Sequence, residues 1–221
     1  MNRFILAATT SGLALLSAAA NADVISIDDF DNGDQRIVMT TVGAPITSVN
    51  AYRTLTGTLL AILPPVSAST EVSYGQLHVM NGGGENVEVS VQWNMPAFVL
   101  PANAIDVSFS FNIFFTDGAN TTADFTFAGA SVASFAIPGN SENLELTFTV
   151  DRALLDAGGE LKMTLNGETG WDMDLDSVVL NYNVPATNNV PEPTTIVLMG
   201  VGLLGIGAMG RRRKVCWRRT P

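Results

Sequence analysis

The residues best suited to chemistry are aspartates that gather near both ends of the central part of the chain. Three of them alternate with other residues in the run Asp172-Met173-Asp174-Leu175-Asp176, and three more occur as Asp28, Asp29 and Asp31. In a strand, residues at i, i+2 and i+4 lie on one face about 7 Å apart, so three ionised carboxylates would repel one another. A hard cation would relieve that repulsion, because calcium prefers several carboxylate oxygens and tolerates irregular loops.

Several interpretations of these aspartates remain open from the sequence. If the first and last strands of the domain are neighbours, a calcium site can form, with predicted ligands Asp28, Asp29, Asp31, Asp174 and Asp176. Alternatively the run is a solvated acidic turn. A β-bulge could also re-phase the strand, since the same alternation continues into the apolar Val178 and Leu180. Asp174-Leu175-Asp176 resembles the closing strand of carbohydrate-binding jelly rolls, some of which hold a structural calcium there.

Catalytic candidates are few. His78 is the only histidine, and its neighbours Leu77 and Val79 are expected in the core, so we predict that His78 faces solvent. Cys216, the only cysteine, lies in the C-terminal tail, which excludes Cys–His chemistry from the central part. Ser–His–Asp catalysis and glycoside hydrolysis by paired carboxylates stay as the least favoured alternative, an envelope hydrolase. We therefore expect a protein that is not an enzyme.

Sugar binding requires exposed aromatic side chains. Trp93 falls on the inward phase of its strand and is expected in the core. Trp171 lies beside turn residues, so it is the predicted ligand-binding aromatic of the alternative function, a calcium-dependent carbohydrate-binding module.

Charge is distributed very unevenly along the 221 residues. All 21 acidic residues lie between Asp23 and Glu192, a segment whose only basic residues are Arg36, Arg53, Arg152 and Lys162, so its formal charge is −17. Such a segment repels nucleic acid, which is excluded as a partner.

The fold predicted for residues 23–185 is an all-β antiparallel sandwich, jelly-roll-like, with one short helix. Period-two alternation marks strands at Val87–Trp93, Val107–Phe115 and Leu144–Val150. Shorter strands are predicted near 24–30, 36–42, 52–62, 71–80, 123–127, 132–137, 161–165 and 175–182, giving ten or eleven in all. The helix is predicted at 151–157, capped by Asp151 and ended by Gly158-Gly159.

The N-terminus reads as a signal peptide. Residues 1–22 contain Arg3, an apolar run from Phe4 to Ala20, and the small-x-small sequence Ala20-Asn21-Ala22. This pattern predicts export across the inner membrane, with cleavage after Ala22 and loss of the signal helix.

The C-terminus has three parts. Residues 186–193 form a linker that ends in Val190, Pro191, Glu192 and Pro193, where the prolines favour extended, accessible backbone. Residues 194–210 carry no charge and are predicted to be a transmembrane helix. Residues 211–221 form a basic tail, predicted to be cytoplasmic by the positive-inside rule, and its stop signal is Arg211, Arg212, Arg213 and Lys214.

This three-part arrangement resembles the PEP-CTERM sorting signal of Gram-negative bacteria, over about the last thirty residues. The resemblance implies recognition by an exosortase, a membrane-embedded enzyme found in organisms that make exopolysaccharide. We expect an exported, transiently membrane-anchored protein that ends at the cell surface or in an exopolysaccharide (biofilm) matrix, with extracellular polysaccharide as a further partner. The extra residues 215–221 depart from the usual pattern.

Overall fold

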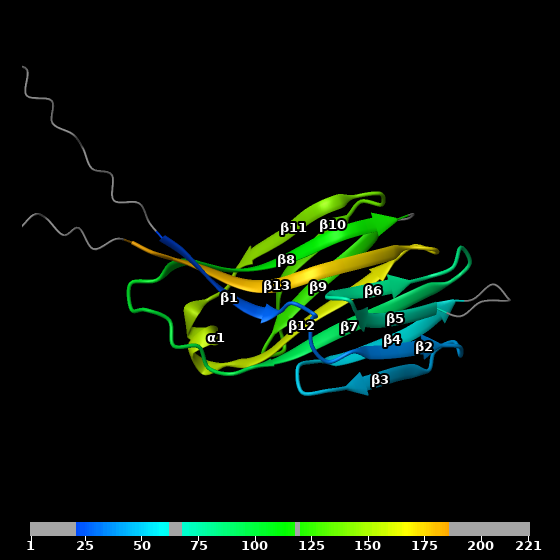
Figure 1. Cartoon of the computed structure of the whole chain (residues 1–221), viewed down its shortest axis with the longest axis horizontal. Coiled ribbons are helices and arrows are strands. Elements are labelled where there is room, and N and C mark those ends of the chain that lie inside the picture. The colour runs from blue at the N-terminus through cyan, green and yellow to red at the C-terminus, as the bar shows by residue number, and fades with distance from the viewer. Residues whose placement is uncertain (1–20, 62–67, 118–119, 186–221) are drawn as a thin grey trace, which may run out of the picture. The chain divides into compact units, whose positions relative to one another are not determined.

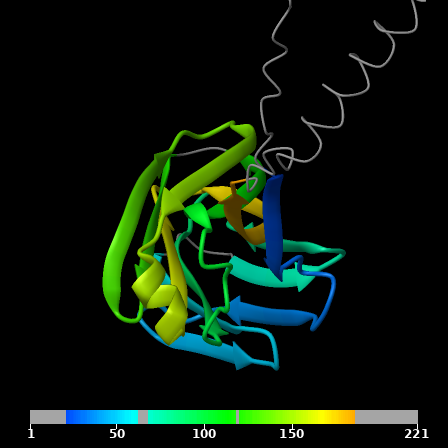
Figure 2. The ribbon, with the colours of Figure 1, turned by 90° about the vertical axis from the view of Figure 1, so that its left-hand side faces the viewer.

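The computed structural model describes residues 21–61, 68–117 and 120–185, which belong to one compact unit. Two antiparallel sheets form it, shown as two layers in Figures 1 and 2. The first sheet has the order β11 (Glu142–Thr149), β8 (Ile105–Asp117), β13 (Asp172–Val184), β6 (Gln76–Met80), β5 (Ala68–Ser73) and β2 (Gln35–Met39), and β1 (Asn21–Asp28) also pairs with β13. The second has the order β10 (Ala130–Ile137), β9 (Thr121–Phe127), β12 (Gly159–Gly167), β7 (Asn86–Met95), β4 (Thr54–Ala61) and β3 (Pro45–Val49).

The predicted all-β antiparallel fold is therefore confirmed, with thirteen strands among the described residues instead of ten or eleven. The predicted strand at 71–80 is a hairpin, because Tyr74 and Gly75 both have positive φ and reverse the chain between β5 and β6. Strand β3 was missed. It begins with Pro45 and lies at the edge of its sheet, where a missing N–H costs no ladder bond.

Aromatic side chains fill the space between the sheets. The rings of Phe111 on β8 and Phe125 on β9 lie 4.4 Å apart between centroids, and Trp93 on β7 packs 6.1 Å from Phe111. Contacts between strands of different sheets show that the two layers share one core. They also confirm the prediction that Trp93 is a core residue, 2% exposed.

The predicted short helix is present as α1 (Arg152–Ala157). The Asp151 side chain accepts a hydrogen bond from the main-chain N–H of Ala153 at 2.9 Å, which caps the first turn. Gly158 ends the helix with φ +70°, and a Cβ there would lie 2.7 Å from the main-chain nitrogen of Ala97. Only glycine fits this close approach. In the described part of the chain no helix has both the length and the apolar character needed to cross a bilayer.

The first and last strands of the sandwich lie side by side. Strands β1 and β13 lie next to each other (Figure 1). They pair antiparallel, with Asn21 opposite Val184. They are thus neighbours, as the calcium hypothesis required. Strand β13 contains thirteen residues, so its first residue, Asp172, lies about 40 Å from Val184 at ~3.3 Å per residue.

Candidate functional site

Asp28 lies in a buried ion pair, which rules it out as a calcium ligand. Arg53 donates to its two carboxylate oxygens from Nε and Nη2, at 2.5 and 2.7 Å. The indole N–H of Trp93 also donates to Oδ2, at 2.7 Å, and the main-chain N–H of Phe30 donates to Oδ1. Asp28 and Arg53 are 7% and 2% exposed. These donors neutralise the carboxylate and join β1 to the second sheet.

The structure does not assemble the predicted calcium site. Among the described residues no three His, Cys, Asp or Glu side chains are grouped so that they could hold a metal ion. Asp29 and Asp31 are exposed in the turn after β1. The register places Asp28 opposite Val178, whereas Asp174 pairs with His78 further along β13. Adjacent strands alone therefore do not bring the two acidic groups together.

A pair of register shifts explains how the alternating aspartates of β13 and the apolar residues that follow them in the same phase can belong to one strand. Between β13 and β8 the pairing passes from Asp174–Phe115 to Leu175–Ile113, and then to Ser177–Asn112. Phe114 and Asp176 are each skipped, so the strand changes phase after Leu175. Met173 and Leu175 are buried before the shift, and Val178 and Leu180 are buried after it. Of the interpretations left open by the sequence, the β-bulge is correct.

His78 and Asp174 form a hydrogen-bonded pair on the outer face of the first sheet. The distance from His78 Nδ1 to Asp174 Oδ1 is 2.7 Å, and His78 Nε2 lies 3.2 Å from the carbonyl oxygen of Ser73. Leu77 and Val79 are buried, so the predicted outward direction of His78 is correct, although its side chain is only 23% exposed. Both ring nitrogens of His78 therefore lie within hydrogen-bond distance of oxygen atoms of the same sheet.

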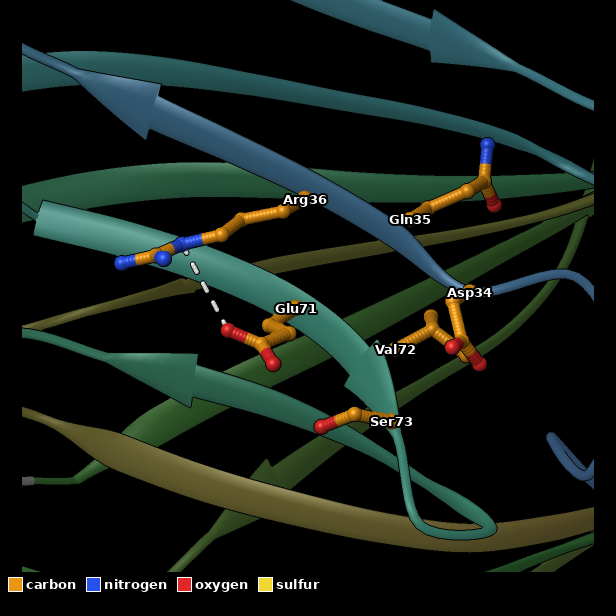
Figure 3. A pocket seen from close by; sticks show the side chains of 6 residues that line it. All are labelled: Asp34, Gln35, Arg36, Glu71, Val72 and Ser73. Atoms are coloured by element: carbon orange, nitrogen blue, oxygen red, sulfur yellow. Dashed lines mark ion pairs between the residues drawn. The ribbon is translucent and has the colours of Figure 1, made fainter.

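Charged side chains continue from the His78–Asp174 pair across two more strands of the same face. Glu71 on β5 lies opposite His78, and Arg36 on β2 lies opposite Glu71. Arg36 Nε and Glu71 Oε2 are 3.4 Å apart beside an open pocket of about 200 Å³ (Figure 3). Basic and acidic side chains therefore alternate across four strands of this face.

Asp172 has an altered acidity. Burial raises the pKa of its carboxyl above the usual value, and the negative charges of Asp117, Asp174 and Glu85 raise the pKa further. The main-chain N–H of Asn81 donates to Asp172 Oδ1 at 2.5 Å and acts in the opposite direction. The charges acting on Asp172 are all carboxylates, which marks this end of the sandwich as strongly negative.

The prediction that Trp171 binds sugar is wrong. Trp171 is 0% exposed, and its indole N–H donates to the carbonyl of Val87 at 3.3 Å. The neighbouring turn misled the sequence argument, because a residue that directly precedes a strand can still point into the core.

An exposed aromatic occurs elsewhere, at the two register shifts. Phe114 is 52% exposed, and it lines an open pocket of about 480 Å³ together with Asp176. The remaining lining residues are Gln76, Asn112, Ile113, Asn143 and Leu144. Sequence analysis missed Phe114 because strict alternation places Phe115, not Phe114, in the apolar set.

The predicted sorting residues lie outside the described residues. They are Val190, Pro191, Glu192 and Pro193, with Arg211, Arg212, Arg213 and Lys214 of the basic stop. The predicted transmembrane helix and residues 1–20 of the predicted signal peptide lie outside as well, whereas Asn21 and Ala22 already belong to β1. Their test comes from comparison with known proteins.

Comparison with solved structures finds matches to carbohydrate-binding modules. TmCBM61 in complex with β-1,4-galactotriose is 18% identical, with 48% of this chain and 68% of that chain covered and a TM-score of 0.31. A mutant of CBM29-2 complexed with mannohexaose is 12% identical (74% and 92% covered, TM-score 0.34). The family 11 module of the cellulase Lic26A-Cel5E of Clostridium thermocellum is 10% identical (72% and 94% covered, TM-score 0.34). The comparison with curated proteins found no match.

A family model matches the end of the chain. It is the PEP-CTERM protein-sorting motif, and the match covers residues 189–214. This segment contains the predicted Pro-Glu-Pro sequence, the uncharged stretch and the Arg-Arg-Arg-Lys cluster. The chain therefore carries a PEP-CTERM protein-sorting motif, which associates it with export and the cell surface.

Proposed function

We propose that this chain is an exported, non-enzymatic protein of the cell surface or the exopolysaccharide matrix, and that an exosortase sorts it through residues 189–214. The observation that carries the proposal is the PEP-CTERM match, which begins five residues after the last strand of the sandwich ends at Val184. The enzyme would then meet its motif just beyond a folded domain.

The pairing of β1 with β13 is compatible with processing at both ends of the domain. Asn21 lies opposite Val184, so the first described strand begins, and the last one ends, at the same end of the first sheet. Cleavage after Ala22 removes only the first two residues of β1, and Asp23 to Asp28 stay paired with β13. A domain built this way can remain folded while each of its ends is processed at a membrane.

A non-catalytic role agrees with how the polar side chains are used. The buried Asp28 is neutralised by Arg53, and both nitrogens of His78 are occupied by Asp174 and Ser73. These groups stabilise the fold or its outer face.

Mass spectrometry of the mature protein from its native cells tests the proposal. We expect an N-terminus at Asp23 and a C-terminus near residues 191–195, with the full C-terminus to Pro221 retained in cells that lack the exosortase. A surface-exposed protein that still ends at Pro221 in exosortase-containing cells would show a permanent tail anchor and would overturn the proposal.

Polysaccharide binding is a second candidate function, favoured by the pocket at the register shifts. Phe114 offers an aromatic face for the C–H groups of a sugar ring, and Asn112, Asn143 and Gln76 carry amides suited to sugar hydroxyls. Affinity electrophoresis of the full chain in detergent, with exopolysaccharide from the native organism in the gel, tests this function. We expect Phe114→Ala to abolish retardation and Tyr74→Ala, a fully exposed control at the hairpin tip, to keep it.

A further inference from the structure

Buried oxygen atoms without hydrogen-bond donors concentrate in one loop. Both carboxylate oxygens of Glu85 and the side-chain oxygen of Asn81 are buried and have no hydrogen-bond partner among the described residues. Glu85 as a whole is 0% exposed. A buried carboxylate normally has donors or a cation, because removing its charge from water costs several kcal/mol. The missing partner must therefore supply positive charge or donors.

The loop of Asn81–Glu85 is held against the segment that precedes β13. Asn81 donates from its main-chain N–H to Asp172 Oδ1 and from its side-chain amide to the carbonyl of Trp171. The main-chain N–H of Gly170 donates to the carbonyl of Glu85 at 2.8 Å. These bonds direct the amide nitrogen of Asn81 toward Trp171 and leave its oxygen for another partner. Glu85 and Asp172 thus lie on two segments that are bonded to each other.

The described basic side chains do not supply the charge. Arg53 pairs with Asp28, Arg36 with Glu71, and Arg152 with Asp156. Lys162 lies opposite Gln92 and Thr126 in the middle of the second sheet. His78 is directed at Asp174 and the carbonyl of Ser73. The pKa of Asp172 is raised by burial and by carboxylates, Glu85 among them, so the two acids affect one another.

We propose that Glu85, Asp172 and Asn81 bind a calcium ion between the Asn81–Glu85 loop and the start of β13. Two carboxylates and an amide oxygen are ligands of the type that calcium uses, and main-chain carbonyls of the glycines at 82–84 and water can complete six to eight oxygens. Only two of these ligands are acidic, which distinguishes this set from a cluster of three acidic side chains. It shares no residue with the calcium site predicted from the sequence.

The ion would stabilise the end of the sandwich that lies far from Asn21 and Val184. It would neutralise the repulsion between Glu85 and Asp172 and fix the glycine-rich loop to β13. This inference is independent of the sorting proposal, since processing at residues 189–214 does not involve these side chains.

The experiment measures calcium-dependent unfolding of the full chain purified in mild detergent after EDTA treatment. At calcium a hundredfold above its Kd, we expect the Tm of the wild type to rise by roughly 5–10 °C, and magnesium to give a smaller shift. Glu85→Gln and Asp172→Asn should lose this rise. The control Asp124→Asn removes an exposed carboxylate on β9, and this variant should retain the calcium-dependent rise in Tm.

Terbium luminescence gives a readout that does not depend on stability. Trp171 directly precedes Asp172, so a terbium ion in this site should show tryptophan-sensitised emission that calcium displaces. Asp172→Asn, at a half-buried position, should still fold and should lose the emission. Overturning results are a wild-type Tm unaffected by millimolar calcium, or a calcium response retained in both Glu85→Gln and Asp172→Asn.

Discussion

Arg53 lies across Asp28 in a two-bond ion pair that is almost completely buried, with nitrogen–oxygen distances of 2.5 and 2.7 Å. The guanidinium also donates to the carbonyls of Asn32 and Gly33, and it lies 5.0 Å from the centre of the Phe30 ring. Every charged atom of the pair therefore has a partner. The pair connects β1, the first described strand, to the second sheet.

Removing one member of this pair should be strongly destabilising. Asp28→Ala leaves the Arg53 charge buried without its counter-ion, and we expect the free energy of unfolding to fall by about 3–5 kcal/mol. Urea denaturation measures the loss. Glu71→Ala, which breaks the exposed pair with Arg36, is the matched control and should cost less than about 1 kcal/mol. Equal losses of stability in Asp28→Ala and Glu71→Ala would contradict the proposal that the buried pair is the more important one for folding.

Trp171 should behave as a core residue and not as a binding residue. Trp171→Ala removes a fully buried indole, so we expect a loss of about 3–5 kcal/mol in the free energy of unfolding. Thermal or urea unfolding measures it, and Tyr74→Ala at the exposed hairpin tip should change stability by less than about 0.5 kcal/mol. A Trp171→Ala variant of wild-type stability would contradict the burial.

The sequence predicted most of the fold because alternation and turn chemistry are local signals. Val87–Trp93 alternates strictly and forms part of β7, and Asp151 with Gly158 correctly defined the helix. The turn at Tyr74-Gly75 was missed, because tyrosine rarely adopts positive φ and gives no turn signal.

The candidate site was less predictable, because it depends on contacts between distant residues. The partner of Asp28 is 25 residues away, and the partner of Asp174 is 96 residues away. The shifts that expose Phe114 and Asp176 arise between two strands and leave no mark in either one alone. Glu85 follows three glycines, a sequence that gives no sign of burial, and only the packing shows that it is buried.

The basic stop at the C-terminus should fix the orientation of the exported chain. Replacing Arg211, Arg212, Arg213 and Lys214 by serine removes the positive charge that, by the positive-inside rule, we expect to retain this end in the cytoplasm. We expect the variant to escape exosortase processing and to appear in the medium with Pro221 intact, as measured by cell fractionation and mass spectrometry. The conservative control changes Lys214 to arginine and should be processed normally. Normal processing of the serine variant would show that the charge is not needed.

Stability should depend on pH through Asp172. Burial raises the folded-state pKa of this carboxyl above its unfolded value, so the folded state binds the proton more tightly. This tighter proton binding stabilises the folded state. The stabilisation is fully present below the unfolded-state pKa, near 4, and it is lost as pH rises through the raised folded-state pKa. Asp172→Asn keeps an acceptor oxygen for Asn81 but cannot ionise. In EDTA, we therefore expect its Tm relative to wild type to increase from pH 4 to pH 7, because only the wild type acquires the unfavourable charge over that range. Asp124→Asn, at an exposed position of β9, should follow the wild-type curve. If Asp172→Asn and wild type lose stability in parallel over this range, the raised pKa of Asp172 does not affect folding.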